Sequence, residues 1–172
     1  GTAAKLVASD VKADLAVLVV TRKSSKTALV RLGRAALGEQ VTAAGFPLPG
    51  ILSGLNITTG NVSSLAGGEE GGTVLRMTTP VQSGNSGGPL LDGGGNIVGV
   101  VVSKLDAVRV AELAGDIPQN VNFAITANAL VNFLEAHRVN YRPSPERRRL
   151  APEEIARKAA EFTVQVECQR TK

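Results

Sequence analysis

The sequence predicts an all-β fold, an antiparallel barrel or sandwich, followed by C-terminal helices. Up to Ile125 the chain consists of short runs of branched apolar residues separated by glycine-rich turns such as Gly67-Gly68 and Gly93-Gly94-Gly95. This spacing is typical of antiparallel β domains. From Asn128 the apolar residues change to helical spacing. The 172 residues are enough for one ordinary domain with its own core.

Seven segments are expected to form strands because they are rich in branched residues or alternate with a period of two. They are residues 5–8, 15–20, 40–44, 56–64, 73–79, 97–102 and 121–125. Asp10 to Asp14 is expected to form the turn between the first two strands. Pro47 ends the third strand, since proline cannot donate to the sheet.

Two helices and a last strand are expected in the C-terminal part. The apolar spacing from Leu130 to Leu134 predicts a helix with Asn128 as its N-cap. Tyr141 to Ser144 is expected to be a proline-broken linker. Pro152 and the two glutamates that follow predict a second helix, because proline suits the first turn and acids suit its positive end. Phe162 to Cys168 alternates with a period of two and predicts a terminal strand that needs a partner edge.

The composition excludes several classes of protein. Apolar residues make up 43% and charged residues 20%, which is unlike a disordered chain or a coiled coil. Aromatic residues are only 3%, so base-stacking surfaces for nucleic acid are not expected. One cysteine, Cys168, and one histidine, His137, cannot form a disulfide or an all-protein zinc site, and no cofactor is expected. No apolar run is long enough for a membrane span. The start at Gly1, without methionine, suggests a fragment or a processed chain.

The clearest chemistry lies in Gln82-Ser83-Gly84-Asn85-Ser86-Gly87-Gly88-Pro89. The glycines around Ser86 allow the backbone to turn sharply, expose the hydroxyl and direct neighbouring N–H groups at one point. That arrangement suits acyl transfer, in which Ser86 attacks a carbonyl while the N–H groups of Gly84 and Ser86 hold the negative oxygen of the intermediate. A glycine-rich hairpin in which Ser86 only fills a turn is the alternative.

The same residues fit the G-x-S-x-G nucleophile elbow of α/β-hydrolases, with Asp106 or Asp116 and then His137 in the order of that triad. Such an elbow leads directly into a helix, which Pro89 and the glycines after it oppose. An esterase of this type is therefore the weaker hypothesis. His137 is better explained as a residue near a helix C-terminus, where positive charge is favourable.

The segment from Gly84 to Leu90 resembles the nucleophile motif of trypsin-like serine proteases, especially of their bacterial HtrA/Deg-type branch. Asp14-Leu15-Ala16-Val17-Leu18 resembles the family's segment with the catalytic aspartate. Three later segments are similar to strands of the family's second barrel, and they are Leu37 to Pro47, Thr58 to Ser63 and Asn122 to Ile125. The resemblance covers roughly Lys5 to Glu135.

The resemblance implies two six-stranded antiparallel barrels with a site in the cleft between them. Residues 1–34 would be the remnant of the first barrel with the inter-barrel linker, and residues 35–127 the complete second barrel. Residues 128–139 would form a closing helix, and residues 140–172 a linker, a second helix and a terminal strand. The bacterial branch also favours a periplasmic or secreted location.

By this resemblance Ser86 is the nucleophile, Asp14 the orienting acid, and the N–H groups of Gly84 and Ser86 form the oxyanion hole. The peptide-docking strand would be Val101-Val102-Ser103. The specificity pocket would be lined by Pro80, Val81, Gln82, Val102 and Asn122. Because no acid is among these residues, a small or medium apolar side chain is expected before the scissile bond of a polypeptide substrate.

The family's catalytic histidine precedes its aspartate, and no histidine precedes Asp14 in this sequence. Without an imidazole to accept its proton, Ser86 is an ordinary alcohol. We therefore expect a serine endopeptidase in the intact protein, with the missing N-terminal segment as the partner of a chain that is inactive alone. A pseudoprotease or peptide-binding module is the alternative, and an upstream histidine would distinguish the two.

Overall fold

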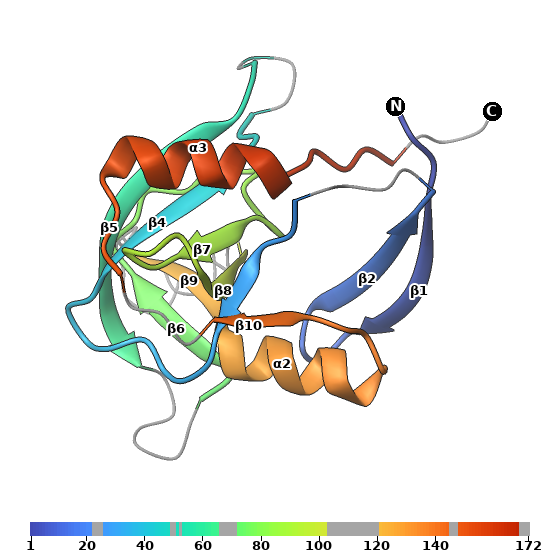
Figure 1. Ribbon diagram of the computed structural model, residues 1–172, viewed down its shortest axis with the longest axis horizontal. Coiled ribbons are helices and arrows are strands. Elements are labelled where there is room, and N and C mark those ends of the chain that lie inside the picture. Colours follow the sequence, from blue (N-terminus) through green and yellow to red (C-terminus); the bar gives the residue numbers. More distant parts are fainter. Residues whose placement is uncertain are drawn as a thin grey trace, which may run out of the picture.

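The computed structural model describes residues 1–21, 26–48, 51, 53–65, 72–102, 121–144 and 148–168. In this part of the chain there are ten strands and two helices (Figure 1). The strands are β1 (Ala4–Asp10), β2 (Leu15–Val20), β3 (Leu29–Arg31), β4 (Gln40–Gly45), β5 (Asn56–Leu65), β6 (Val74–Met77), β7 (Pro89–Leu91), β8 (Ile97–Val102), β9 (Asn122–Thr126) and β10 (Arg142–Ser144). The helices are α2 (Ala127–Ala136) and α3 (Pro152–Phe162).

Six of the strands form a closed antiparallel barrel. They are hydrogen-bonded in the order β8-β7-β4-β5-β6-β9, and β9 pairs back with β8. Closure leaves these strands without an unpaired edge. The predicted all-β antiparallel barrel with C-terminal helices is therefore confirmed.

Alternation along the strands fills the barrel interior. In β4, Val41 and Ala43 point inward and are at most 2% exposed, whereas Ala44 points to the outer side. Because successive residues of a strand face opposite sides, one strand serves two apolar layers. The interior core also contains Ala35, Val62, Leu75, Met77, Leu90, Val98, Val101 and Ala124.

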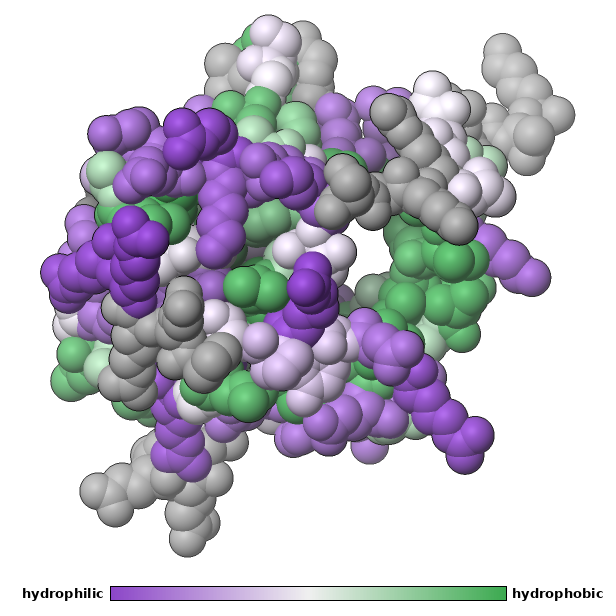
Figure 2. All heavy atoms as spheres, in the orientation of Figure 1, coloured by the Kyte–Doolittle hydropathy of each residue, from purple (hydrophilic) through white to green (hydrophobic). Residues whose placement is uncertain are grey.

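Strands β1 and β2 form a separate hairpin that docks beside the barrel (Figure 1). One face is anchored, because Leu15 packs against Ile125 of β9 and Phe133 of α2. Ala8, Ala13 and Val17 are partly buried in the same cluster. The large apolar side chains of the two strands that are exposed are Leu6, Val7, Leu18, Val19 and Val20. Figure 2 shows a hydrophobic patch on the hairpin. The segments 5–8 and 15–20 predicted as strands are thus present as β1 and β2.

Three local predictions were wrong. The N-cap of α2 is Thr126, whose side chain accepts a hydrogen bond from the N–H of Ala129, because β9 runs directly into the helix. Residues 142–144 are not a linker but β10, which pairs in parallel with β3 and tolerates a proline because it is an edge strand. Residues 163–168 lie in no strand, since they meet no sheet edge among the described residues.

Helix α3 lies across the outside of the barrel (Figure 1). Its buried residues Ile155 and Ala159 pack against Ala44 and Leu91, while its outer face is hydrophilic (Figure 2). The carboxylate of Glu154 accepts the N–H of Ala151 at 3.0 Å, which stabilises the start of the helix. The C-terminal segment is therefore part of the folded domain.

A buried ion cluster fixes the linker between hairpin and barrel. Arg31 of β3 is 6% exposed and donates to Glu39 and, at 3.3 Å, to Asp92. Asp92 also accepts the N–H of Asn96 at 2.9 Å. Burial works to lower the pKa of Arg31, but the hydrogen bonds and negative charges of Glu39 and Asp92 together outweigh it, so that this pKa is raised. Arg31 therefore stays charged and fastens β3 to two parts of the barrel.

Candidate active site

Ser86 lies in the loop between β6 and β7, and residues 82–88 are called the Ser86 loop below. The Ser86 residue is exposed. Within the loop, the N–H of Asn85 donates to the carbonyl of Gln82 and the N–H of Gly88 donates to that of Asn85, both at 3.0 Å. These two short-range bonds make a compact turn that carries Ser86 at the surface.

The Ser86 loop is bonded to the end of β8 and to the chain after β4. The N–H of Gly87 donates to the carbonyl of Val101 at 2.8 Å, and the N–H of Val101 donates to that of Gly88 at 2.9 Å. The N–H of Leu48 donates to the carbonyl of Ser83, also at 2.8 Å. The loop is thus held from two sides of the barrel.

Glycine is required in this loop for two different reasons. Gly84 and Gly87 have φ angles of 99° and 80°, a region in which other residues are strained. Gly88 has no space for a side chain, because a Cβ would lie 2.3 Å from the carbonyl oxygen of Ala44. The pattern of glycines around Ser86 in the sequence therefore has a direct structural cause.

Asn85 is the buried residue at the base of the Ser86 loop. It is 4% exposed and lies against Gly45, where a Cβ would be 2.7 Å from its Oδ1. That oxygen accepts no hydrogen bond from the described residues. The sequence motif placed Asn85 between two functional residues but gave no sign of this burial, which depends on a glycine in a distant strand.

Gly84 precedes Ser86 by two residues in the loop. Gly84 is exposed, and among the described residues no acceptor is bonded to its N–H. An unoccupied amide next to a nucleophile can donate to an oxygen that becomes negative during acyl transfer, which is worth about 3–4 kcal/mol in known sites. The role of Gly84 in the oxyanion hole stays a prediction.

Asp14 is the last residue of the turn between β1 and β2. It is exposed and has a φ of 51°, a conformation that aspartate tolerates better than most residues. The carboxylate of Asp10 stabilises the same turn by accepting the N–H groups of Lys12 and Ala13, at 2.8 and 3.1 Å. The turn thus positions Asp14 immediately before the anchored residue Leu15.

Strand β8 brings the two candidate segments to the same region. Leu15, which follows Asp14, belongs to an apolar cluster that includes Val100 and Val102 of β8. Between these two residues, Val101 is hydrogen-bonded to the Ser86 loop. The residue after Asp14 and strand β8 therefore pack on one apolar cluster, and the end of β8 is hydrogen-bonded to the Ser86 loop.

The residues predicted for the specificity pocket lie on the loop before Ser86 and on β9. Pro80 is exposed and accepts a hydrogen bond from the hydroxyl of Thr58 at 2.7 Å, Val81 packs against the barrel core, and Gln82 is exposed. The side-chain amide of Asn122 donates to the carbonyl of Thr79 at 2.9 Å. Thr79 is fully buried and was not predicted from the sequence, because a lone threonine before a proline has no distinguishing pattern.

The predicted peptide-docking strand is only partly described. Val101 points into the barrel core, and its N–H and carbonyl groups are hydrogen-bonded to the Ser86 loop. Val102 is half-buried beside the hairpin. Ser103 lies outside the described residues, as do Asp106 and Asp116.

The α/β-hydrolase hypothesis is wrong. The Ser86 loop leads into strand β7 and not into a helix. His137 is the C-cap of α2, where its Nδ1 lies 2.9 Å from the carbonyl oxygen of Phe133 and its ring packs on Phe133. His137 therefore caps the C-terminal end of helix α2.

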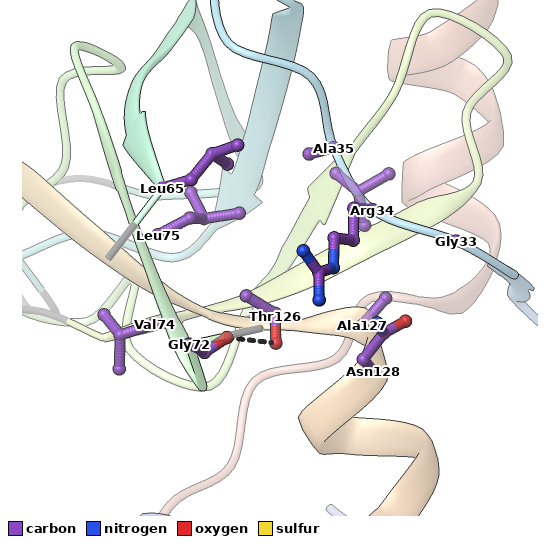
Figure 3. Close-up of a pocket in the computed structure, with 11 residues that line it drawn as sticks. Gly33, Arg34, Ala35, Leu65, Gly72, Val74, Leu75, Thr126, Ala127 and Asn128 are labelled. Atoms are coloured by element: carbon purple, nitrogen blue, oxygen red, sulfur yellow. Dashed lines mark hydrogen bonds between the residues drawn. The ribbon is translucent and has the colours of Figure 1, made fainter. Parts of the chain in front are cut away.

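A cavity elsewhere in the molecule contains none of the predicted site residues (Figure 3). It measures about 40 Å³ and lies where β6 meets the start of α2. Its wall includes Leu75 and Ala127, with Arg34 extending toward Thr126, whose hydroxyl donates to the carbonyl of Gly72. The cavity is a packing defect at the barrel end and not the predicted cleft.

The described residues contain no group of three or more potential metal ligands. Within the same part of the chain, no helix has the length and apolar character needed to cross a membrane.

Comparison with protein families matches residues 1–100 to the trypsin-like peptidase domain. The chain belongs to this family. The match includes both Asp14 and Ser86, so the two candidate segments lie within one family domain.

Relatives of this peptidase domain include bacterial serine proteases. The chain is 43% identical, over 96% of its own length, to the uncharacterized protein y4bJ of Sinorhizobium fredii. It is 37% identical, over 68% of its own length, to the serine protease Do-like HtrB of Bacillus subtilis. These matches cover 26% and 28% of the relatives, so the chain spans about a quarter of their length. The serine endoprotease from Yersinia pestis superposes with a TM-score of 0.62 at 25% identity, over 78% of this chain and 43% of that protein.

Proposed function

We propose that the intact protein is a serine endopeptidase in which Ser86 is the nucleophile and Asp14 the acid that orients a histidine. The observation that supports it best is the link through β8, whose end is hydrogen-bonded to the Ser86 loop and which packs on the same apolar cluster as Leu15, the residue after Asp14. The exposed amide of Gly84 beside Ser86 adds a donor for the oxyanion. The names of the serine protease relatives agree with this activity.

The proposed reaction has two halves. Ser86 Oγ attacks the carbonyl carbon of a peptide bond while its proton passes to the imidazole. The former carbonyl oxygen becomes negative and accepts hydrogen bonds from the N–H groups of Gly84 and Ser86. The imidazole then protonates the leaving nitrogen, and the C–N bond breaks to leave an acyl-enzyme on Ser86. In the second half, water attacks this ester and gives up a proton to the imidazole. The imidazole returns that proton to Ser86 Oγ as the ester C–O bond breaks, which releases the acid and restores the serine.

The imidazole must come from outside residues 1–172, because the one histidine of this chain caps helix α2. We place it in a preceding segment of the same protein, which would also cover the exposed apolar face of the hairpin. The polypeptide substrate would carry a small or medium apolar side chain before the scissile bond, since Pro80, Val81, Val102 and Asn122 present no charge.

Labelling with a fluorophosphonate tests the proposal. The intact protein should react at Ser86, and Ser86→Ala should abolish the reaction, whereas the exposed serine variant Ser53→Ala should react like wild type. Residues 1–172 alone should react at least about a thousandfold more slowly, because a triad without its base loses several powers of ten. Equal labelling of the intact protein and its Ser86→Ala variant would refute the proposal, and no labelling of either would favour a peptide-binding pseudoprotease.

A further inference from the structure

Helix α3 covers the outer side of two barrel strands that adjoin the Ser86 loop. Ile155 and Ala159 pack against Ala44 of β4 and Leu91 of β7, and all four side chains are at most 6% exposed. Partly buried neighbours complete the layer, and they are Leu55, Ile57, Ile97, Leu150 and Phe162. The helix thus excludes water from the outer face of both strands.

The same two strands hold the Ser86 loop. Asn85 is seated directly on Gly45, and Gly88 lies so close to the carbonyl of Ala44 that a Cβ would be 2.3 Å from its oxygen. Strand β7 begins at Pro89, immediately after Gly88. Ala44 is therefore contacted by α3 through its side chain and by the loop through its carbonyl.

The docking of α3 is supported by specific polar contacts. The N–H of Leu150 donates to the carbonyl of Gly93 at 2.7 Å, and Lys158 Nζ donates to that of Gly94 at 2.9 Å. Gly94 has no room for a side chain, because a Cβ would lie 2.8 Å from the carbonyl oxygen of Arg148. The turn between β7 and β8 is thus shaped to receive the C-terminal segment.

We propose that α3 is a positioning element for the Ser86 loop, acting through Ala44 and Gly45. With α3 docked, β4 and β7 are backed by a packed layer, and Asn85 has a rigid surface beneath it. With α3 displaced, Ala44 and Leu91 would face water, and the loop would open more often while the barrel stays folded. Only the catalytic consequence rests on the proposed function, since the mechanical coupling does not require Ser86 to be a nucleophile.

Residue-resolved hydrogen exchange of the chain tests the coupling with a matched pair of variants. Both residues belong to α3, where Ala159 lies on the face buried against the barrel and Ala160 is exposed. A159D should therefore displace the helix, whereas A160D should lower helix propensity by a similar amount and leave the helix docked. In A159D the amides of Gly87 and Gly88 should exchange about tenfold faster than in A160D, a change equivalent to about 1.4 kcal/mol. The paired amides of Leu75 and Ala124 should be unchanged in both.

Faster exchange in α3 with unchanged exchange at Gly87 and Gly88 would overturn the proposal. If A159D accelerates exchange at all amides alike, the milder variant K158M, which removes only the hydrogen bond to Gly94, replaces it in the comparison. Unchanged exchange at Gly87 and Gly88 in K158M would also overturn the proposal. In the intact protein, A159D should lower the rate of fluorophosphonate labelling about tenfold relative to A160D. If Ser86 is not a nucleophile, no variant will be labelled, and the hydrogen-exchange comparison still decides whether α3 is coupled to the Ser86 loop.

Discussion

The barrel and the β1–β2 hairpin are built from similar residues but differ in burial. Leu75 and Val98 of the barrel are 1% exposed, whereas Leu18 and Val19 of the hairpin are 41% and 52% exposed. Every barrel strand has a partner on both sides, while β1 and β2 pair only with each other. Branched residues therefore specify a strand, but the number of neighbouring elements specifies whether the strand contributes to a core.

The candidate active site draws on both regions. Ser86 comes from the barrel and Asp14 from the hairpin turn. The barrel half is fixed by hydrogen bonds to β8 and by contacts with β4, whereas the hairpin half is anchored mainly through the cluster around Leu15. The geometry of the pair thus depends on a region with little core of its own.

The largest expected difference between the two regions concerns charge. Replacing Arg31 by methionine leaves Asp92 buried without its cation, which should destabilise the chain by about 3–5 kcal/mol. Lys5 on the hairpin is exposed, and Lys5→Met should change stability by no more than about 0.5 kcal/mol. Urea unfolding followed by circular dichroism measures both. Similar losses in the two variants would mean that the ion cluster does not stabilise the fold.

The second prediction compares one apolar side chain in each region. Leu75→Ala should cost about 2–5 kcal/mol because it opens a cavity in the barrel core. Leu18→Ala should cost less than about 1 kcal/mol in this chain, because water already reaches that side chain. The same unfolding assay reports both values. A cost at Leu18 as large as that at Leu75 would show that its face is covered in solution.

The smallest effect concerns Tyr141, in the segment between α2 and β10 and part of neither region. Its hydroxyl donates to Glu135 at 2.8 Å, and this hydrogen bond raises the pKa of Tyr141 above its usual 10.0. Because the folded pKa is the higher one, the stabilisation is complete below the unfolded pKa and is lost as pH rises through the folded pKa. Tyr141→Phe should therefore lower the melting temperature slightly at pH 8 and not at strongly alkaline pH. A difference that persists at alkaline pH contradicts this account.

Local pattern was sufficient for most elements and insufficient for four, which are β3, β7, β10 and the residues after α3. The segments 15–20 and 97–102 are the strands β2 and β8 with the predicted bounds, because long branched runs carry a strong signal. Strands β3 and β7 have only three residues each, too few to show alternation. Residues 163–168 alternate like a strand, yet alternation alone does not supply an edge to pair with.

By itself, the sequence determined that this chain is a β protein with two C-terminal helices and a glycine-bounded serine, because backbone propensity and glycine conformation are local properties. Only the tertiary structure decided which branched strands are buried, that Leu15 and β8 share one apolar cluster, and that α3 packs behind β4. These facts depend on contacts between residues far apart in the chain, such as Gly45 with Asn85 or Ile155 with Ala44, and no local pattern encodes them.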